Sequence, residues 1–215
     1  MMRVTSGAVA RQTFLTAVTN QIDSASANRG IRAAAVMLVA ALTATAAQVS
    51  VPLPFTPVPL TFQPMIVLLG GVALGSSLGM WSQIVYLAIG ALGLPVFAAS
   101  PLLPQGIARL VGPTGGYLLC YPIAAFVAGW LAERGFDRRY LGSVVAMAAG
   151  LVIIYASGTS WLALMTASVP SGGLQAALAA GVYPFVLADI FKLFVAAGVM
   201  PGLWRLTGLR GSHQS

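Results

Sequence analysis

Long apolar runs, separated by short polar connections or by stretches rich in proline and glycine, dominate this chain. A helix needs about 20 mostly apolar residues to cross the roughly 30 Å hydrocarbon core of a bilayer. The pattern predicts six membrane-spanning helices, the second of them short: Ile31–Val51, Gln63–Leu74, Leu78–Leu92, Tyr117–Leu131, Tyr140–Met165 and Val182–Leu206. We therefore expect an all-α integral membrane protein with six transmembrane helices and extended Pro/Gly-rich outer loops.

Two of the connections are expected to be extended and to face outward. Four prolines between residues 52 and 59 exclude a helix there, because proline lacks the amide hydrogen and restricts the residue before it. The connection 94–116 is similarly rich in proline and glycine. Non-helical backbone at membrane depth is tolerated where protein buries it or a cavity adjoins it. The segment 52–63 is therefore either a surface loop or a pocket wall.

The composition fits one membrane domain flanked by tails. Charged residues make up 7% of the 215 residues, whereas a soluble domain carries about 25%. Residues 1–28 are mixed and polar, and we expect a mobile or surface-lying tail there, with a second tail at 211–215. Residues 29–210 are expected to form a single six-helix domain that binds a substrate.

The arginines predict the orientation in the membrane. With six spans both termini share one side, and that side collects Arg3, Arg11, Arg29, Arg32, Arg134, Arg138, Arg139, Arg205 and Arg210. Arg109 falls on the opposite side. Because lysine and arginine concentrate in cytoplasmic loops, both termini are predicted to be cytoplasmic, in the cytoplasmic membrane of a bacterium. The arginines flank apolar runs and form no basic face, so the net charge of +7 indicates membrane lipid and no nucleic acid.

Asp189 and Lys192 are the sole charged residues between Tyr140 and Trp204. Each costs roughly 2.5 to 3.5 kcal/mol at a helix centre on insertion scales, so such residues are usually functional. Three positions apart they share a helix face, and their side chains tilt toward the outer end of the last span. The pair predicts an outward-facing pocket for a small polar solute. The alternative is that the two charges only neutralise each other, and both interpretations hold if a ligand opens the pair.

Three other polar residues are candidates for the same pocket, and each has a plainer interpretation. Arg109 is either a second anchor for an anion or a solvated loop charge. Tyr117 either stacks on or hydrogen-bonds a ligand, or is an interfacial aromatic residue. Gln63 is either a polar pocket residue or part of a helix start.

Catalytic and metal chemistry find no support in the sequence. One cysteine, Cys120, and one histidine, His213, cannot form a metal set. There is no catalytic triad, no paired acids and no Walker A motif. We expect neither an enzyme nor a cofactor, and any energy for transport must come from a partner or a gradient. Ala40 and Ala44 form a small-xxx-small pattern that serves either internal packing or docking of another membrane subunit.

Four stretches, in this order, resemble the BioY family, the biotin-specific substrate-binding subunit of energy-coupling factor (ECF) transporters. They are PFTPVPLTFQ at 54–63, GALGLPVF at 90–97, GPTGGYL at 112–118, and a Pro-Phe pair followed by D-x-x-K at 184–192. The order and spacing fit from about residue 31 to 206. The resemblance implies a six-helix membrane protein with an outward pocket for biotin.

The resemblance also implies site residues and partners. The family's D-x-x-K pair, which contacts ligand, falls on Asp189 and Lys192, and the aromatic residue of its G-G-Y segment falls on Tyr117. Implied partners are a transmembrane coupling subunit and two cytoplasmic ATPases, docked partly through small residues of the first helix. The chain departs from the family pattern across 98–110, so Ser100 and Arg109 are candidates from that loop without a family counterpart.

Biotin carries an aliphatic carboxylate and a ureido ring, which suit one cationic and one anionic group in a pocket. The sequence does not fix which end of biotin each residue touches. We expect the loops at 52–63 and 94–116 to cover the ligand. Two rival interpretations remain: the same fold serving another vitamin, and a membrane assembly subunit without transport whose Asp189–Lys192 pair only sets helix packing.

Overall fold

The computed structural model describes residues 12–20, 24–99, 105–168 and 172–207. The elements in chain order are α1 (Phe14–Thr19), α2 (Ala25–Gln48), β1 (Ser50–Val51), β2 (Leu60–Thr61), α3 (Gln63–Leu74), α4 (Ser76–Ala91), α5 (Ile107–Val111), α6 (Gly115–Leu119), α7 (Tyr121–Ala132), the short 3-10 helix η2 (Phe136–Arg138), α8 (Tyr140–Thr166), α9 (Leu174–Gly181), α10 (Tyr183–Ala197) and α11 (Val199–Leu206). Among these residues the strands form one antiparallel two-stranded pair, so the all-α class is confirmed.

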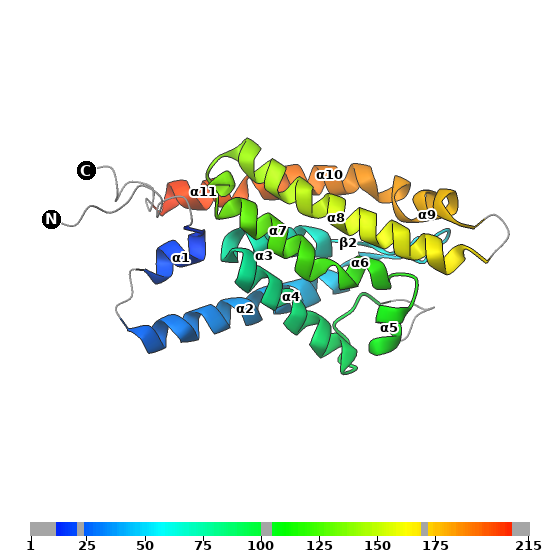
Figure 1. The fold of residues 1–215 in the computed structure, drawn as a ribbon, viewed down its shortest axis with the longest axis horizontal. Coiled ribbons are helices and arrows are strands. Elements are labelled where there is room, and N and C mark those ends of the chain that lie inside the picture. Colours follow the sequence, from blue (N-terminus) through cyan, green and yellow to red (C-terminus); the bar gives the residue numbers. More distant parts are fainter. Residues whose placement is uncertain (1–11, 21–23, 100–104, 169–171, 208–215) are drawn as a thin grey trace.

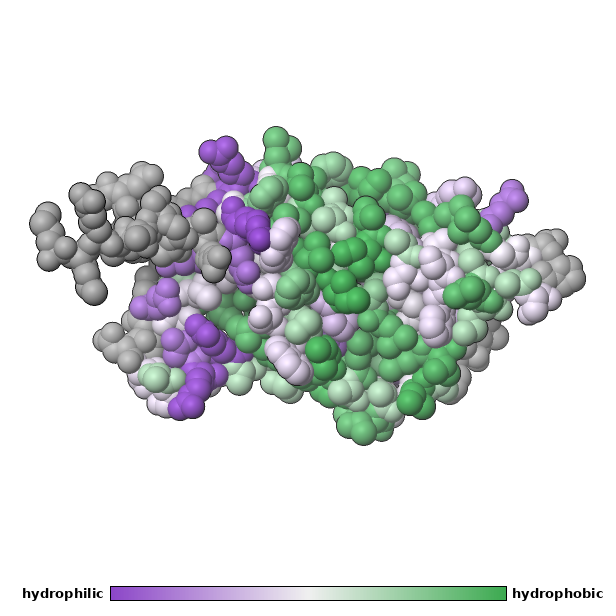
Figure 2. Space-filling view, viewed as in Figure 1, coloured by the Kyte–Doolittle hydropathy of each residue, from purple (hydrophilic) through white to green (hydrophobic). Residues whose placement is uncertain are grey.

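The helices run roughly along the long axis of the molecule (Figure 1). Helix α7 packs against α3, α4 and α8, and its inward face is made of fully buried alanines. The α1 and α11 helices lie at one end of the molecule, while α5 and α9 lie toward the other end. Hydrophobic residues cover the middle of the surface in Figure 2, and hydrophilic residues gather at the end that carries α1 and α11. This pattern is typical of a bundle surrounded by lipid.

A single glycine turns the chain between α3 and α4. Gly75 has a φ of +89°, which glycine adopts at little cost. Behind this turn the backbones of α3, α4 and α7 touch directly. A Cβ added at Gly71 would overlap the carbonyl of Ala125, and one added at Gly79 would collide with Gly71. Small residues at helix contacts permit this close packing inside a membrane.

Four helical stretches of the described residues are long and apolar enough to cross a membrane: Ala25–Gln48, Gly115–Ala132, Tyr140–Thr166 and Tyr183–Leu206. They correspond to the predicted first, fourth, fifth and sixth spans. The predicted second and third spans coincide with α3 and α4, which have 12 and 16 residues. At 1.5 Å per residue these helices are only about 18 and 24 Å long. Both are shorter than the roughly 30 Å hydrocarbon core of a bilayer.

Two of the predicted spans are interrupted. The helix axis breaks at Cys120 between α6 and α7, just before Pro122, and at Gly198 between α10 and α11, just before Pro201. Proline cannot donate the helical hydrogen bond and crowds the preceding turn, so each break lies where the sequence weakens the helix. The predicted connection 94–116 is also not wholly irregular, because it contains α5.

The first long helix begins earlier and ends earlier than predicted. Helix α2 starts at Ala25, where the Ser24 hydroxyl accepts a hydrogen bond from the amide of Ala27. It ends at Gln48, because the chain becomes extended in β1 ahead of the prolines. Within the segment expected to be a tail, residues 14–19 form α1, and Phe14 packs against the core.

Trp204 holds three segments together at the end of the bundle. Its indole N–H donates to Asp137 of η2 at 2.6 Å, and its ring meets Phe14 of α1 edge to face at 5.6 Å. The guanidinium of Arg138 lies 5.0 Å from the ring centre. Trp204 is 1% exposed, so these contacts are shielded from water.

Replacing Trp204 by phenylalanine should lower the free energy of unfolding by about 1 to 3 kcal/mol, the range for a hydrogen bond to a charged group. The aromatic packing survives, but the indole donor to Asp137 is lost. Thermal unfolding in detergent measures the change. Trp81 is 52% exposed, so Trp81→Phe is the matched control and should stay within about 0.5 kcal/mol. Equal melting temperatures for the two variants would contradict the role given to the Trp204 hydrogen bond.

Candidate binding site

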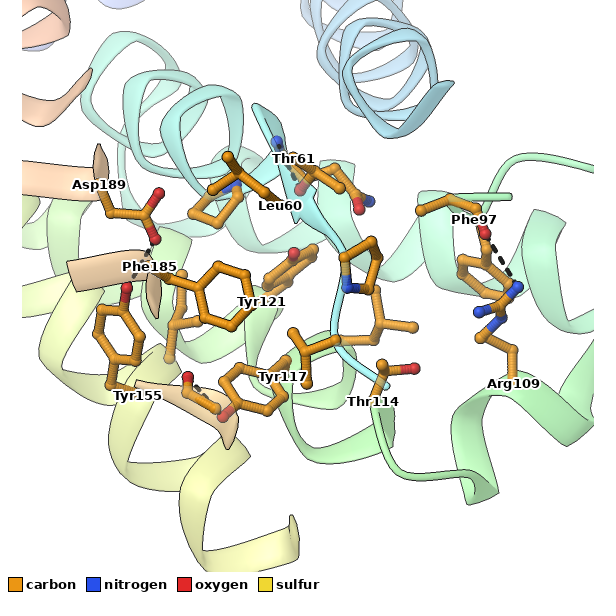
Figure 3. Close-up of a pocket in the computed structure, with 18 residues that line it drawn as sticks. Leu60, Thr61, Phe97, Arg109, Thr114, Tyr117, Tyr121, Tyr155, Phe185 and Asp189 are labelled. Carbon is orange, nitrogen blue, oxygen red and sulfur yellow. Dashed lines mark hydrogen bonds between the residues drawn. The ribbon is translucent and has the colours of Figure 1, made fainter. Parts of the chain in front are cut away.

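A cavity lies between the extended segment 58–61 and parts of α7, α8 and α10, and its empty volume, including space open to solvent, is about 650 Å³. Figure 3 shows that its side chains come from segments far apart in the sequence. The lining residues are Val58, Pro59, Leu60, Thr61, Gln63, Pro64, Phe97, Ala98, Arg109, Thr114, Tyr117, Leu118, Tyr121, Ile154, Tyr155, Gly181, Phe185 and Asp189. The lining is largely apolar, with a few polar groups at defined places, as is usual for small-molecule sites.

Asp189 forms one end of this cavity. Its Oδ2 accepts a hydrogen bond from the Tyr155 hydroxyl at 2.8 Å, and its Oδ1 accepts one from the Lys192 ammonium at 2.9 Å. The two partners reach the carboxylate from α8 and from one turn further along α10. A carboxylate oxygen has a second lone pair, so Asp189 retains acceptor capacity toward the cavity that it lines.

Lys192 lies behind Asp189, outside the set of residues that line the large cavity. Its ammonium also donates to the carbonyl of Thr61 at 2.8 Å and lies 5.1 Å from the centre of the Phe62 ring. With Asp189 it borders a second, smaller cavity between α3, α8 and α10, whose empty volume, including space open to solvent, is about 230 Å³. Lys192 therefore joins the last span to the extended segment and fixes Asp189 from the rear.

Arg109 lies at the other end of the large cavity, and Figure 3 places it well away from Asp189. It comes from α5, is 2% exposed, and donates from Nη2 to the carbonyl of Ala98 at 2.9 Å. Burial lowers the pKa of its guanidinium, and the nearby Tyr86 opposes this shift. A guanidinium stays protonated in proteins, so the cavity has an anionic end and a cationic end. The hydroxyl of Thr114 is also buried at the cavity wall.

Aromatic rings separate the two polar ends. Figure 3 shows Tyr117, Tyr121 and Phe185 between Asp189 and Arg109. Tyr117 is held by its hydroxyl, which donates to the carbonyl of Gly181 at 2.9 Å. Its ring lies against Gly158 of α8 so closely that a Cβ at that position would overlap it. The ring position thus depends on the absence of a side chain at this glycine.

The structure brings together four of the six predicted ligand residues. The residues that line the large cavity are Asp189, Tyr117, Gln63 and Arg109. Lys192 does not line it but donates a hydrogen bond to Asp189, which does. Gln63 donates to the Tyr86 hydroxyl at 2.6 Å, which ties it to α4. Ser100 lies outside the described residues. The interpretation of Arg109 as a solvated loop charge is wrong, because its side chain is buried.

Ala40 and Ala44 face inward. Ala40 is 3% exposed and belongs to the hydrophobic core, and Ala44 packs against that core. In this conformation their pattern serves internal packing, the first of the two uses expected for it. Exposed small residues of α2 include Gly30, Ala33, Ala34 and Ala41.

Several lining residues were missed by sequence reasoning. Thr114, Phe97 and Phe185 lie inside the stretches that carry the family resemblance, but the sequence did not indicate that their side chains line a cavity. Tyr155 and Tyr121 lie in apolar helices outside those stretches. A phenolic hydroxyl within an apolar span needs a partner, and that signal could have singled out Tyr155.

The fold and the cavity define a class: a helical membrane protein with a pocket that has a carboxylate at one end and a guanidinium at the other. The BioY family profile matches residues 17–208, so the chain belongs to the BioY family.

Several relatives are similar to this protein over most of the chain. The probable biotin transporter BioY of Pyrococcus horikoshii is 44% identical over 161 residues, which is 75% of this chain and 88% of that protein. The biotin transporter BioY of Thermotoga maritima is 42% identical over 158 residues, or 73% of this chain and 86% of that protein. A crystal structure of the S-component for biotin from an ECF-type ABC transporter matches with a TM-score of 0.73 and 21% identity. It covers 85% of this chain and 95% of its own, and shows that the two share a fold.

Proposed function

We propose that this protein binds biotin from the outer side of the membrane and supports its uptake as the substrate-specific subunit of an ECF-type transporter. The observation that carries the proposal is the cavity with Asp189 and Arg109 at opposite ends and aromatic rings between them. Biotin has matching chemistry, with N–H donors at one end, a carboxylate at the other and an apolar middle. The names of the relatives support the same substrate.

The geometry supports one orientation of the ligand. The ureido ring lies at Asp189, whose carboxylate accepts from a ureido N–H, and Tyr155 and Lys192 hold that carboxylate in place. The valerate carboxylate points to Arg109, because a guanidinium forms strong charge-assisted hydrogen bonds with carboxylates. The thioether ring and the aliphatic chain lie against Tyr117 and Phe185.

The chain crosses the membrane six times in this proposal, with both termini in the cytoplasm. The short helices α3 and α4 are the second and third crossings and are joined at Gly75. A short crossing is accommodated by local thinning of the bilayer and by neighbouring helices. The arginine-rich end that carries α1 and α11 is then cytoplasmic, which agrees with the concentration of positive charge on that side.

A transmembrane coupling subunit and two ATPases supply the energy in this proposal, and the chain itself catalyses no reaction. The coupling subunit contacts the lipid-facing side of α2, where Gly30, Ala34 and Ala41 are exposed. Small residues allow another helix to approach closely. This assignment moves the docking surface from the buried Ala40 and the half-buried Ala44 to the neighbouring exposed side of the same helix.

A ligand panel tests the function directly. The purified full chain should be stabilised against thermal unfolding by biotin, and not by thiamine or riboflavin at the same concentration. Stabilisation by another vitamin in place of biotin would assign the fold to a different solute. No stabilisation by any of the three would favour the assembly-subunit interpretation.

Replacing Arg109 by methionine should weaken biotin binding about tenfold or more, because a hydrogen bond to a charged group contributes about 1.5 to 3 kcal/mol. Titration calorimetry in detergent measures the affinity. Biotin methyl ester, which lacks the anion, is the control ligand. Its affinity should change much less between the two proteins. An equal loss of affinity for biotin and for its methyl ester would mean that the carboxylate of biotin does not bind Arg109.

A further inference from the structure

The end of the bundle that carries α11 and η2 is both basic and rich in exposed apolar side chains. Residues 133–139 and 199–206 together hold four arginines and two carboxylates. Both carboxylates are used internally. Glu133 accepts from the amide and the hydroxyl of Ser76 at 2.7 and 2.8 Å, and Asp137 accepts from Trp204 and is fully buried. The arginines therefore dominate what this end presents outward.

Each exposed arginine has an exposed apolar neighbour. Arg134 stacks on Trp130, with its guanidinium carbon 3.2 Å from the ring centre, and this tryptophan is 42% exposed. Arg205 precedes Leu206, which is 86% exposed. Cations beside apolar side chains suit the boundary between lipid headgroups and acyl chains.

A third cation lies at the start of α8. Arg139 is exposed and occupies the N-cap position of this 27-residue helix without a capping side-chain hydrogen bond, and the nearby Leu141 is 73% exposed. The first turn of α8 carries no acid, so the positive end of the helix is not neutralised from within the turn. Helix α11 contacts both η2 and α8, which brings Arg139 and Arg205 to the same end of the molecule.

We propose that Arg134, Arg139 and Arg205, with the apolar side chains beside them, form a binding surface for the phosphate headgroup of an anionic phospholipid. The arginines bind the phosphate and the negative charge of the headgroup. Trp130, Leu141 and Leu206 contact the upper part of the acyl chains. The surface lies at the opposite end of the bundle from α5 and the large cavity, and it is independent of the proposed substrate (Figure 1, Figure 2).

The test compares two double variants that remove the same charge from different places. Arg139→Gln/Arg205→Gln changes the proposed surface, and Arg29→Gln/Arg32→Gln removes two arginines from α2. Native mass spectrometry of the full chain in detergent counts bound phosphatidylglycerol against phosphatidylcholine of the same acyl chains. The first variant should lose phosphatidylglycerol preference by about fivefold for each arginine. The α2 variant should stay within about twofold of the unchanged protein, because its two arginines lie outside the proposed surface.

A second pair of measurements keeps the test decisive. Arg139→Lys/Arg205→Lys retains the charge and should keep most of the preference, so a loss in the glutamine variant cannot be blamed on a damaged fold. Biotin binding, measured on the same samples, should be unchanged in all variants. Equal losses in both glutamine variants would reduce the effect to net charge and overturn the site. Full retention of the phosphatidylglycerol preference in both glutamine variants would also overturn the site. The arginines would then be assigned to contact with an acidic protein partner. Displacement by excess inorganic phosphate would show a simple anion site instead of a lipid site.

Discussion

Replacing Asp189 by asparagine is expected to weaken biotin binding by at least tenfold. The carboxylate accepts from Tyr155 and Lys192 through different oxygens, so its orientation in the cavity is fixed before a ligand arrives. A hydrogen bond from a ureido N–H to this anion is charge-assisted, and such bonds contribute about 1.5 to 3 kcal/mol. Asparagine keeps the shape but offers one neutral acceptor and places an N–H₂ group beside Tyr155 or Lys192. Titration calorimetry with biotin measures the loss.

The same substitution should also destabilise the protein without ligand. Both side chains of the ion pair are about nine-tenths buried, at 12% and 11% exposure. Removing one partner of a buried pair leaves the other charge uncompensated and costs about 3 to 5 kcal/mol. Asp189→Asn/Lys192→Met removes both charges, so thermal stability should recover while biotin binding stays weak. Recovery of binding in the double variant would reduce Asp189 to a counter-ion of Lys192 and contradict its role as a ligand acceptor.

Lys192 shows where sequence reasoning about the site reached its limit. The spacing of three residues correctly placed its side chain beside Asp189. Its contact with the carbonyl of Thr61, 131 residues away, depends on how the extended segment folds back over the last span. Helical spacing carries no information about that segment. The sequence thus indicated the pair but not that Asp189 faces the large cavity while Lys192 lies behind it.

The fold itself was predictable where hydropathy decides and less so where backbone geometry decides. Apolar runs marked all the long helices, because the bilayer demands apolar length. The start of α2 was missed, since polar residues such as Asn28 do not end a helix once Ser24 caps it. The breaks at Cys120 and Gly198 were missed as well, although a proline follows each one. The burial of Arg109 was not predicted, because the sequence of the connection does not reveal that α5 packs beside the 94–98 segment. There the guanidinium of Arg109 donates to the carbonyl of Ala98.

Replacing Gly158 by alanine should weaken biotin binding by at least tenfold, although this residue does not line the cavity. A methyl group on Gly158 would overlap the ring of Tyr117. On its other side the Tyr117 hydroxyl is held by the Gly181 carbonyl. The ring must therefore tilt into the cavity or push α8 away. Overpacking of this kind costs about 1 to 3 kcal/mol. Titration with biotin measures affinity, and thermal unfolding separates a blocked cavity from a damaged fold.

Gly202→Ala and Gly30→Ala are the matched controls. Both glycines lie in helices, and an added methyl group would meet no atom within 4 Å at either position. Alanine stabilises a helix relative to glycine by roughly 0.5 to 1 kcal/mol, so these variants should bind biotin normally and melt slightly later. In Gly158→Ala, Tyr117→Leu should restore the melting temperature by removing the overlapping ring, while biotin affinity remains reduced because the aromatic wall is lost. Wild-type affinity in Gly158→Ala would mean that the Tyr117 ring moves freely away from the ligand, and the wall assigned to it would have to be formed by other residues.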